Sequence, residues 1–87
     1  MVFLKYNLQK VQFLSIPQQK IMFMMFNNSS RINYKDQNIY KKEQSFIKAM
    51  RNLCNQKCVK EINGKDFFTE FELTDNGSYY VKHVILS

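Results

Sequence analysis

Proline and glycine are scarce in this chain, with one Pro and two Gly among 87 residues. The turns of a many-stranded β fold favour these two residues, so the composition argues against such a fold. Two Cys and one His exclude a disulfide-dense scaffold and a four-ligand zinc site built from them alone. The longest apolar run, Ile21–Phe26, has six residues and is too short to cross a bilayer. Lys5 interrupts the apolar start of the chain before the core of a signal peptide can form.

Apolar side chains are abundant, because they make up 45% of the sequence and include eight Phe and five Tyr. This composition supports a hydrophobic core and is not that of a disordered protein. The length allows one core rather than two. We therefore expect a single domain over residues 1–87, with an N-terminal segment 1–14, a central unit 15–73 and a C-terminal segment 74–87.

Positive charge is in excess and unevenly placed. Thirteen Lys and Arg face seven Asp and Glu, which gives a net charge of +6. Residues 1–60 contain eleven of the basic residues and two acids, whereas residues 61–87 contain two basic residues and five acids. A one-sided positive field indicates a polyanionic partner, either nucleic acid or an anionic membrane surface. The alternative is that these are the ordinary solvated lysines of a small soluble protein.

A helix is predicted over residues 16–26. Ser15 supplies an N-cap hydroxyl, Pro17 lies in the first turn, and Gln18 stands at the capping-box position. The polar run 27–30 should end the helix. Its apolar side chains cover nearly the whole circumference, which is typical of a central helix with several neighbours. A methionine-rich binding groove is the alternative interpretation.

Two more helices are predicted by apolar residues at helical spacing, an amphipathic one over residues 1–14 and one over about 42–56. Between the helices 16–26 and 42–56, a short helix is expected over about 32–40, where Ile and Tyr side chains supply the apolar contacts. The core stripe of the helix 42–56 consists of Phe46, Met50 and Leu53.

After Cys58 the period of the apolar residues changes from that of a helix to that of a strand, which predicts a β-hairpin. Its first strand is 59–62, Asn63 and Gly64 form the favoured two-residue turn, and the return strand is 67–73. The residues expected on one side of the return strand are Phe67, Thr69, Phe71 and Leu73.

A last helix is predicted over about 75–86. Thr74 is its N-cap, and Asp75 in the first turn complements the helix dipole. The expected apolar face consists of Tyr80, Val81, Val84 and Ile85.

Three segments carry a resemblance to a known family. Residues 14–21 read Leu-Ser-Ile-Pro-Gln-Gln-Lys-Ile, residues 46–59 have the spacing Phe-x3-Met-x2-Leu-x4-Cys-Val, and residues 73–77 read Leu-Thr-Asp-Asn-Gly. They are similar to the first core helix, the recognition helix and the wing-to-helix junction of winged helix-turn-helix domains. The chain from Ser15 onward thus resembles the small MarR-like transcriptional regulators. This implies an α+β fold with a three-helix core, a two-stranded β-hairpin wing and additional terminal helices.

Two positions depart from the family's pattern. Lys57 stands where the family has a Gly before the wing, and the hairpin segment 63–66 lacks the Arg of the family's Asp-x-Arg motif. The chain is also too short for the ligand-sensing pocket of larger members. The resemblance therefore implies DNA binding with no cofactor and no small-molecule ligand.

The helix 42–56 is predicted to enter the major groove of double-stranded DNA, because this groove admits one α-helix whose N-terminal half reaches the base edges. Gln44, Ser45 and Lys48 lie off the core stripe there and are the candidate base-reading residues, with Asn52 on the same face. A solvated face of an amphipathic helix is the alternative. The candidate phosphate contacts are Lys41, Lys42, Arg51, Arg31, Lys35 and, on the wing, Lys65.

We predict no catalytic function for the two cysteines and the histidine. Cys58 takes a core position and is expected to be a small buried hydrophobe, whereas Cys54 is either similar or a redox-active thiol. His83 is expected at the surface. Neither a catalytic group nor a phosphate-binding loop is recognisable, so no enzyme and no metal site is expected.

We therefore expect a cytoplasmic, homodimeric DNA-binding protein that regulates transcription, in a prokaryotic cell or in the host of a prokaryotic virus. The pairing surface is expected on the segment 1–14 and the last helix, because their apolar residues would otherwise be left uncovered. The alternatives are a winged-helix module for protein–protein assembly and a basic membrane-surface protein.

Overall fold

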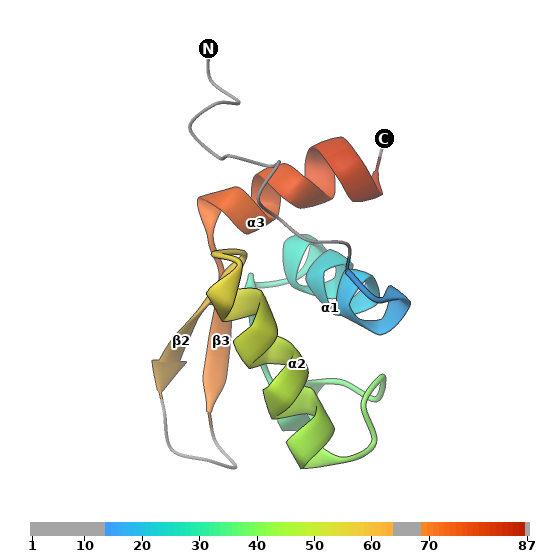
Figure 1. Cartoon of the computed structure of the whole chain (residues 1–87), viewed down its shortest axis with the longest axis vertical. Helices are drawn as coiled ribbons and strands as arrows, with labels where there is room; N and C mark the ends of the chain where they lie inside the picture. Colours follow the sequence, from blue (N-terminus) through green and yellow to red (C-terminus); the bar gives the residue numbers. More distant parts are fainter. Residues whose placement is uncertain (1–13, 64–68, 87) are drawn as a thin grey trace.

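The computed structural model describes residues 14–63 and 69–86 (Figure 1). It shows an α+β fold in which helices pack on a three-stranded antiparallel sheet. The helix predicted over residues 1–14 lies outside the described residues, apart from Leu14, which is buried. The elements in chain order are α1 (Ile16–Asn27), β1 (Arg31–Asn33), the 3-10 turn η3 (Tyr34–Asp36), α2 (Glu43–Asn55), β2 (Val59–Asn63), β3 (Glu70–Leu73), α3 (Asp75–Tyr80) and the π-helical turn η5 (Val81–Ile85).

The strand order of the sheet is β1-β3-β2, so β3 lies in the middle and pairs with both neighbours. Along β3, Phe71 and Leu73 are buried while Glu70 and Glu72 are half-buried on the other face. This confirms the predicted alternation for the described part of the strand. The ring of Phe71 meets that of Phe46 from α2 edge-on, with centroids 5.9 Å apart. The sheet and α2 therefore share one core.

The short helix predicted over residues 32–40 is wrong. Residues 31–33 form strand β1, in which Ile32 is buried and the main chain pairs with β3. The second edge of β3 needs hydrogen-bond partners, and pairing outweighs the weak helical preference of this segment. A single 3-10 turn follows, and the side chain of Asn33 caps it by accepting a hydrogen bond from the Lys35 amide over 2.8 Å.

The predicted capping box of α1 is confirmed. Ser15 Oγ accepts from the Gln18 amide over 3.3 Å, and Gln18 Oε1 accepts from the Ser15 amide over 3.0 Å. The prediction of a central helix with several neighbours is confirmed, because α1 contacts α2, β3 and η5, while Ile16 and Phe23 are 59% and 38% exposed. Two methionines of α1 belong to the core rather than to a binding groove. The buried residues of this helix are Ile21, Met22 and Met25.

Helix α2 ends at Asn55, and its predicted core stripe is fully buried. Two residues after the helix, the chain adopts the left-handed conformation. Lys57 has a φ of 67°, and its amide donates to Cys54 O over 3.0 Å. The Cys58 amide donates to Leu53 O over 2.9 Å. These two bonds form a Schellman ending, whose left-handed position favours Gly. Lys57 thus adopts a backbone conformation that favours Gly.

Strands β2 and β3 form the predicted hairpin, but the two-residue turn expected at Asn63-Gly64 is wrong. Asn63 belongs to β2 and pairs with Glu70, so Asn63 is a strand residue and not the first residue of the turn. The buried residues of β3 fix this register, and β2 adapts to it by a shift between Glu61 and Asn63. Residues 64–68 lie outside the described residues.

The C-terminal helical segment begins as predicted at Thr74, whose hydroxyl accepts from the Gly77 amide over 3.0 Å. This hydroxyl also donates to Lys57 O over 2.6 Å, which ties α3 to the turn before β2. Gly77 permits a close approach, because a Cβ there would collide with Cys58 O and lie 2.8 Å from Leu73 Cδ1. Of the predicted apolar face, Tyr80 and Val81 are buried, Ile85 is half-buried and Val84 is exposed.

Candidate nucleic-acid interface

The outward face of α2 presents the predicted polar residues. Gln44, Ser45, Lys48 and Arg51 are all exposed, on the side opposite the buried core stripe. A groove of about 740 Å³ runs along this face, lined in its described part by residues that include Gln44, Lys48 and Arg51. A second hollow of about 630 Å³ lies towards the start of α1, and Ser45 and Lys48 line it. Lys48 therefore stands between two concave surfaces.

Positive charge gathers where α2 begins. Lys41 and Lys42 precede the helix, Lys48 follows within two turns, and all three side chains are exposed. Within the described ranges, no carboxylate lies within ion-pair distance of these three lysines. The Lys42 side chain makes no capping hydrogen bond to the first turn of α2. The acidic residue Glu43 lies in this turn. The exposed end of a helix macrodipole adds positive potential to the lysines.

A hydrogen-bonded loop fixes the segment that carries Lys41 and leads into α2. Gln37 Nε2 donates to the main-chain oxygens of Tyr34 and Tyr40, each over 3.0 Å, and Gln37 Oε1 accepts from the Tyr40 amide over 2.7 Å. The Tyr34 hydroxyl donates to Lys41 O. Both tyrosine rings pack on Phe46, with centroids 5.9 and 6.4 Å away. No sequence pattern indicates this role of Gln37, because its hydrogen bonds lie within an irregular loop.

Arg51 lies in the groove but has a partner. Its Nε is 3.6 Å from Glu61 Oε1 on β2. Glu61 is registered opposite the buried Phe71, so its position in the strand is on the side that faces α2. The sequence placed Arg51 among the phosphate contacts and did not reveal this pairing, which joins two elements whose relative position only the fold determines.

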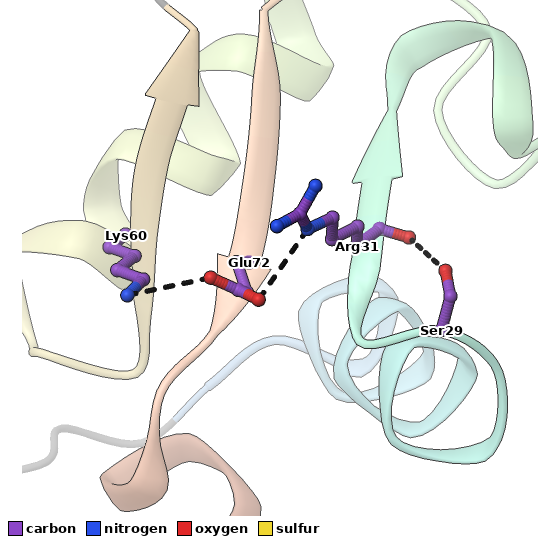
Figure 2. Close-up of polar contacts among 4 residues, drawn as sticks. All are labelled: Ser29, Arg31, Lys60 and Glu72. Carbon is purple, nitrogen blue, oxygen red and sulfur yellow. Dashed lines mark hydrogen bonds and ion pairs between the residues drawn. The ribbon is translucent and has the colours of Figure 1, made fainter.

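Arg31 is also paired, on the outer face of the sheet. Glu72 lies in register between Arg31 of β1 and Lys60 of β2. Its two carboxylate oxygens are 3.5 Å from Arg31 Nε and 3.4 Å from Lys60 Nζ (Figure 2). Ser29 Oγ donates to Arg31 O over 3.5 Å at the edge of the sheet. The structure therefore places Arg31 on a different surface from Gln44 and Lys48.

Asn52 is tied to α1. Its Oδ1 accepts from Gln18 Nε2 over 3.0 Å and from Gln56 Nε2 over 2.9 Å. Gln18 Nε2 also donates to Ala49 O over 3.2 Å. Asn52 is a predicted DNA contact, and its side-chain oxygen connects α2 to α1.

Two predicted phosphate contacts remain, Lys35 and Lys65. Lys35 is exposed in the 3-10 turn after β1, and Lys65 lies outside the described residues. The residues that the structure brings together at the start of α2 are Lys41, Lys42, Gln44, Ser45 and Lys48.

The cysteines are poorly suited to thiolate chemistry. Both are free; Cys58 is buried and Cys54 half-buried. Burial raises the pKa of the Cys58 thiol to about 11. Burial and the nearby Glu61 carboxylate raise the pKa of Cys54, against a smaller lowering effect of Arg51. A raised pKa keeps a thiol protonated and less nucleophilic, which disfavours the redox interpretation of Cys54.

No metal-binding group of three His, Cys, Asp or Glu side chains occurs within residues 14–63 and 69–86. In the same residues, no helix combines the length and the apolar character needed to span a bilayer. Comparison with known proteins gives no match among family models, curated proteins or solved structures. Function is therefore inferred from the geometry of the chain itself.

Proposed function

We propose that this protein binds double-stranded DNA in a sequence-specific manner, as a winged helix-turn-helix regulator of transcription without catalytic activity. The observation that carries the proposal is the start of α2. Gln44, Ser45 and Lys48 project from one exposed face, and Lys41 and Lys42 stand beside them without carboxylate partners in the described part of the chain.

The fold supports this proposal in part. Helix α2 is followed by an antiparallel hairpin, which is the order of a recognition helix and a wing and supports the proposal. The element before α2 departs from the expectation, because a three-residue 3-10 turn stands where a helix was predicted. The hydrogen bonds of Gln37 hold the loop that leads to α2 in place of a full preceding helix.

The proposed contacts follow from the chemistry of the exposed groups. The Gln44 amide can pair with the N6 and N7 atoms of adenine, Lys48 can donate to O6 and N7 of guanine, and Ser45 can donate or accept. Lys41 and Lys42 would bind phosphates on either side and fix the position of α2 in the major groove. The hairpin would lie along the adjacent backbone as the wing.

We further propose that two copies act together, because one recognition helix reads too few base pairs to locate a unique site. An apolar hollow between α1 and the C-terminal segment is the proposed pairing surface, and its lining includes the exposed Ile16, Phe23 and Leu86. The C-terminal helical segment lies at the end of the molecule opposite the start of α2 (Figure 1). Pairing there leaves both recognition helices free. Tyr80 does not contribute, because it is buried within the monomer.

A binding titration against salt tests the proposal and separates it from the membrane alternative. Affinity for duplex DNA should fall linearly on a log–log plot, with a slope of about 0.9 for each neutralised phosphate. Lys42→Ala should reduce this slope, whereas Lys82→Ala, the same charge change in the C-terminal turn η5, should not. Affinity that does not respond to salt, or binding to anionic vesicles in place of DNA, would refute DNA binding.

The assignment of reader and anchor residues has its own test. Gln44→Ala should lower the preference for a selected site over random duplex by about 1–3 kcal/mol. Lys42→Ala should weaken binding to both duplexes alike. Identical profiles for the two variants would show that α2 does not read bases, and a folded protein with no DNA affinity would favour the protein–protein alternative.

A further inference from the structure

Exposed cations near α2 fall into two groups that differ in their partners. Lys41, Lys42 and Lys48 have no carboxylate within ion-pair distance in the described part of the chain. Arg51 is paired with Glu61 over 3.6 Å, although it lines the same groove as Gln44 and Lys48. The strongest hydrogen-bond donor in the groove is therefore the one whose charge is compensated within the protein.

The geometry of the Arg51–Glu61 ion pair allows a phosphate to replace Glu61 as the partner of Arg51. The side chain of Arg51 is 57% exposed and that of Glu61 is 32% exposed. The arginine side chain is therefore open to water, and the glutamate side chain is more enclosed. Exposed pairs of this kind contribute little to folding stability. A phosphate oxygen that approaches the groove can thus compete with Glu61 for the guanidinium.

A second ion-paired carboxylate, that of Glu72, lies on the other face of the sheet and provides an internal comparison. Glu72 pairs with both Arg31 and Lys60 (Figure 2). It alternates with the core-facing Phe71 and Leu73 along β3. Its side chain is 27% exposed, close to the value for Glu61. The two carboxylates therefore belong to one hairpin, have similar exposure and engage arginines, yet only Glu61 faces α2.

We propose that Glu61 is a specificity-determining residue of the DNA-binding surface, which acts by holding Arg51 away from phosphates. This inference rests on the proposed DNA binding by α2. An Arg–phosphate contact forms on any sequence and strengthens non-specific binding. By competing for Arg51, Glu61 lowers this sequence-independent part. Discrimination then depends more on the base contacts of Gln44, Ser45 and Lys48.

Glu61→Gln removes the competing charge and retains the size of the side chain. It should tighten binding to random duplex about threefold, the size expected from the loss of an exposed ion pair. The log–log salt slope should steepen by up to about 0.9, because one more cation reaches a phosphate. Affinity for a selected site should rise less, so the ratio of specific to random affinity should fall.

Glu72→Gln is the matched control, with the same charge change in the same hairpin. It should change random-duplex affinity less than Glu61→Gln and leave the salt slope unchanged. The double variant Glu61→Gln/Arg51→Ala should lose the gain, since the released guanidinium is its cause. Thermal unfolding of each variant verifies that the fold persists.

Three results would overturn the inference: equal gains for Glu61→Gln and Glu72→Gln, no gain for Glu61→Gln, or a gain that persists without Arg51. Each of these leaves the wild-type affinity for DNA intact. A wild-type protein without salt-dependent DNA binding would instead refute the proposed function itself, so the two failures are distinguishable.

Discussion

Gln18 on α1 donates a hydrogen bond to Oδ1 of Asn52 on α2 over 3.0 Å. The same Gln18 side chain completes the capping box of α1 through its Oε1 atom. One glutamine therefore fixes the start of α1 and its position against α2 together. Because α2 carries the proposed base-reading residues, this bond also helps to orient them.

Asn52→Ala should lower the free energy of unfolding by about 1 kcal/mol, because two amide groups lose their acceptor at a partly exposed site. The affinity of the folded protein for DNA should change little. Chemical denaturation measures the first quantity and a binding titration the second. Asn55→Ala is the control, since Asn55 is exposed one turn later on α2. A large loss of site preference with unchanged stability would return Asn52 to the base-reading set.

Lys57→Gly should stabilise the protein by about 1 kcal/mol. A non-Gly residue in the left-handed region is strained, and Lys57 has a φ of 67°. The free energy gained by relieving this strain exceeds the cost of the additional conformational entropy that Gly gives the unfolded chain. Thermal or chemical unfolding provides the measurement. Asn55→Gly within α2 should instead destabilise the fold, and a loss of stability in both variants would contradict the assigned helix ending.

Stability should fall between about pH 9 and pH 11. Burial raises the pKa of the Cys58 thiol from 9.0 to about 11. The unfolded chain then releases this proton at lower pH than the folded chain, so rising pH favours unfolding through this window. Burial also raises the pKa values of Cys54, Tyr40 and Tyr80, which acts in the same direction. Denaturation curves across this range should show a shallower decline for Cys58→Ala, and equal declines would contradict the burial of the thiol.

Local signals in the sequence predicted most of the helices correctly. The Ser15 cap with Gln18, the Phe46 stripe of α2 and the Thr74 cap all depend on residues a few positions apart. Such contacts form wherever the segment is helical, so spacing alone reveals them. The exposed set on α2 followed from its core stripe by the same rule.

The parts that the sequence did not predict depend on distant partners. Ile32 lies on a strand because β3 has a second edge to pair, and nothing within residues 31–40 indicates that edge. The ion pairs of Arg51 and Arg31 join elements that meet only in the folded chain. For that reason the basic residues could be assigned from sequence to a charged surface, but not divided into paired and unpaired groups.

The most direct test of DNA binding by α2 is an NMR titration of the isotope-labelled protein with duplex DNA, following each backbone amide. The account predicts that the largest shift changes fall on residues 41–48 at the start of α2. Amides of residues 81–86 at the opposite end should shift little (Figure 1). Shift changes concentrated in residues 81–86 would contradict the account. So would the absence of shift changes at DNA concentrations well above those at which salt-dependent binding is measured.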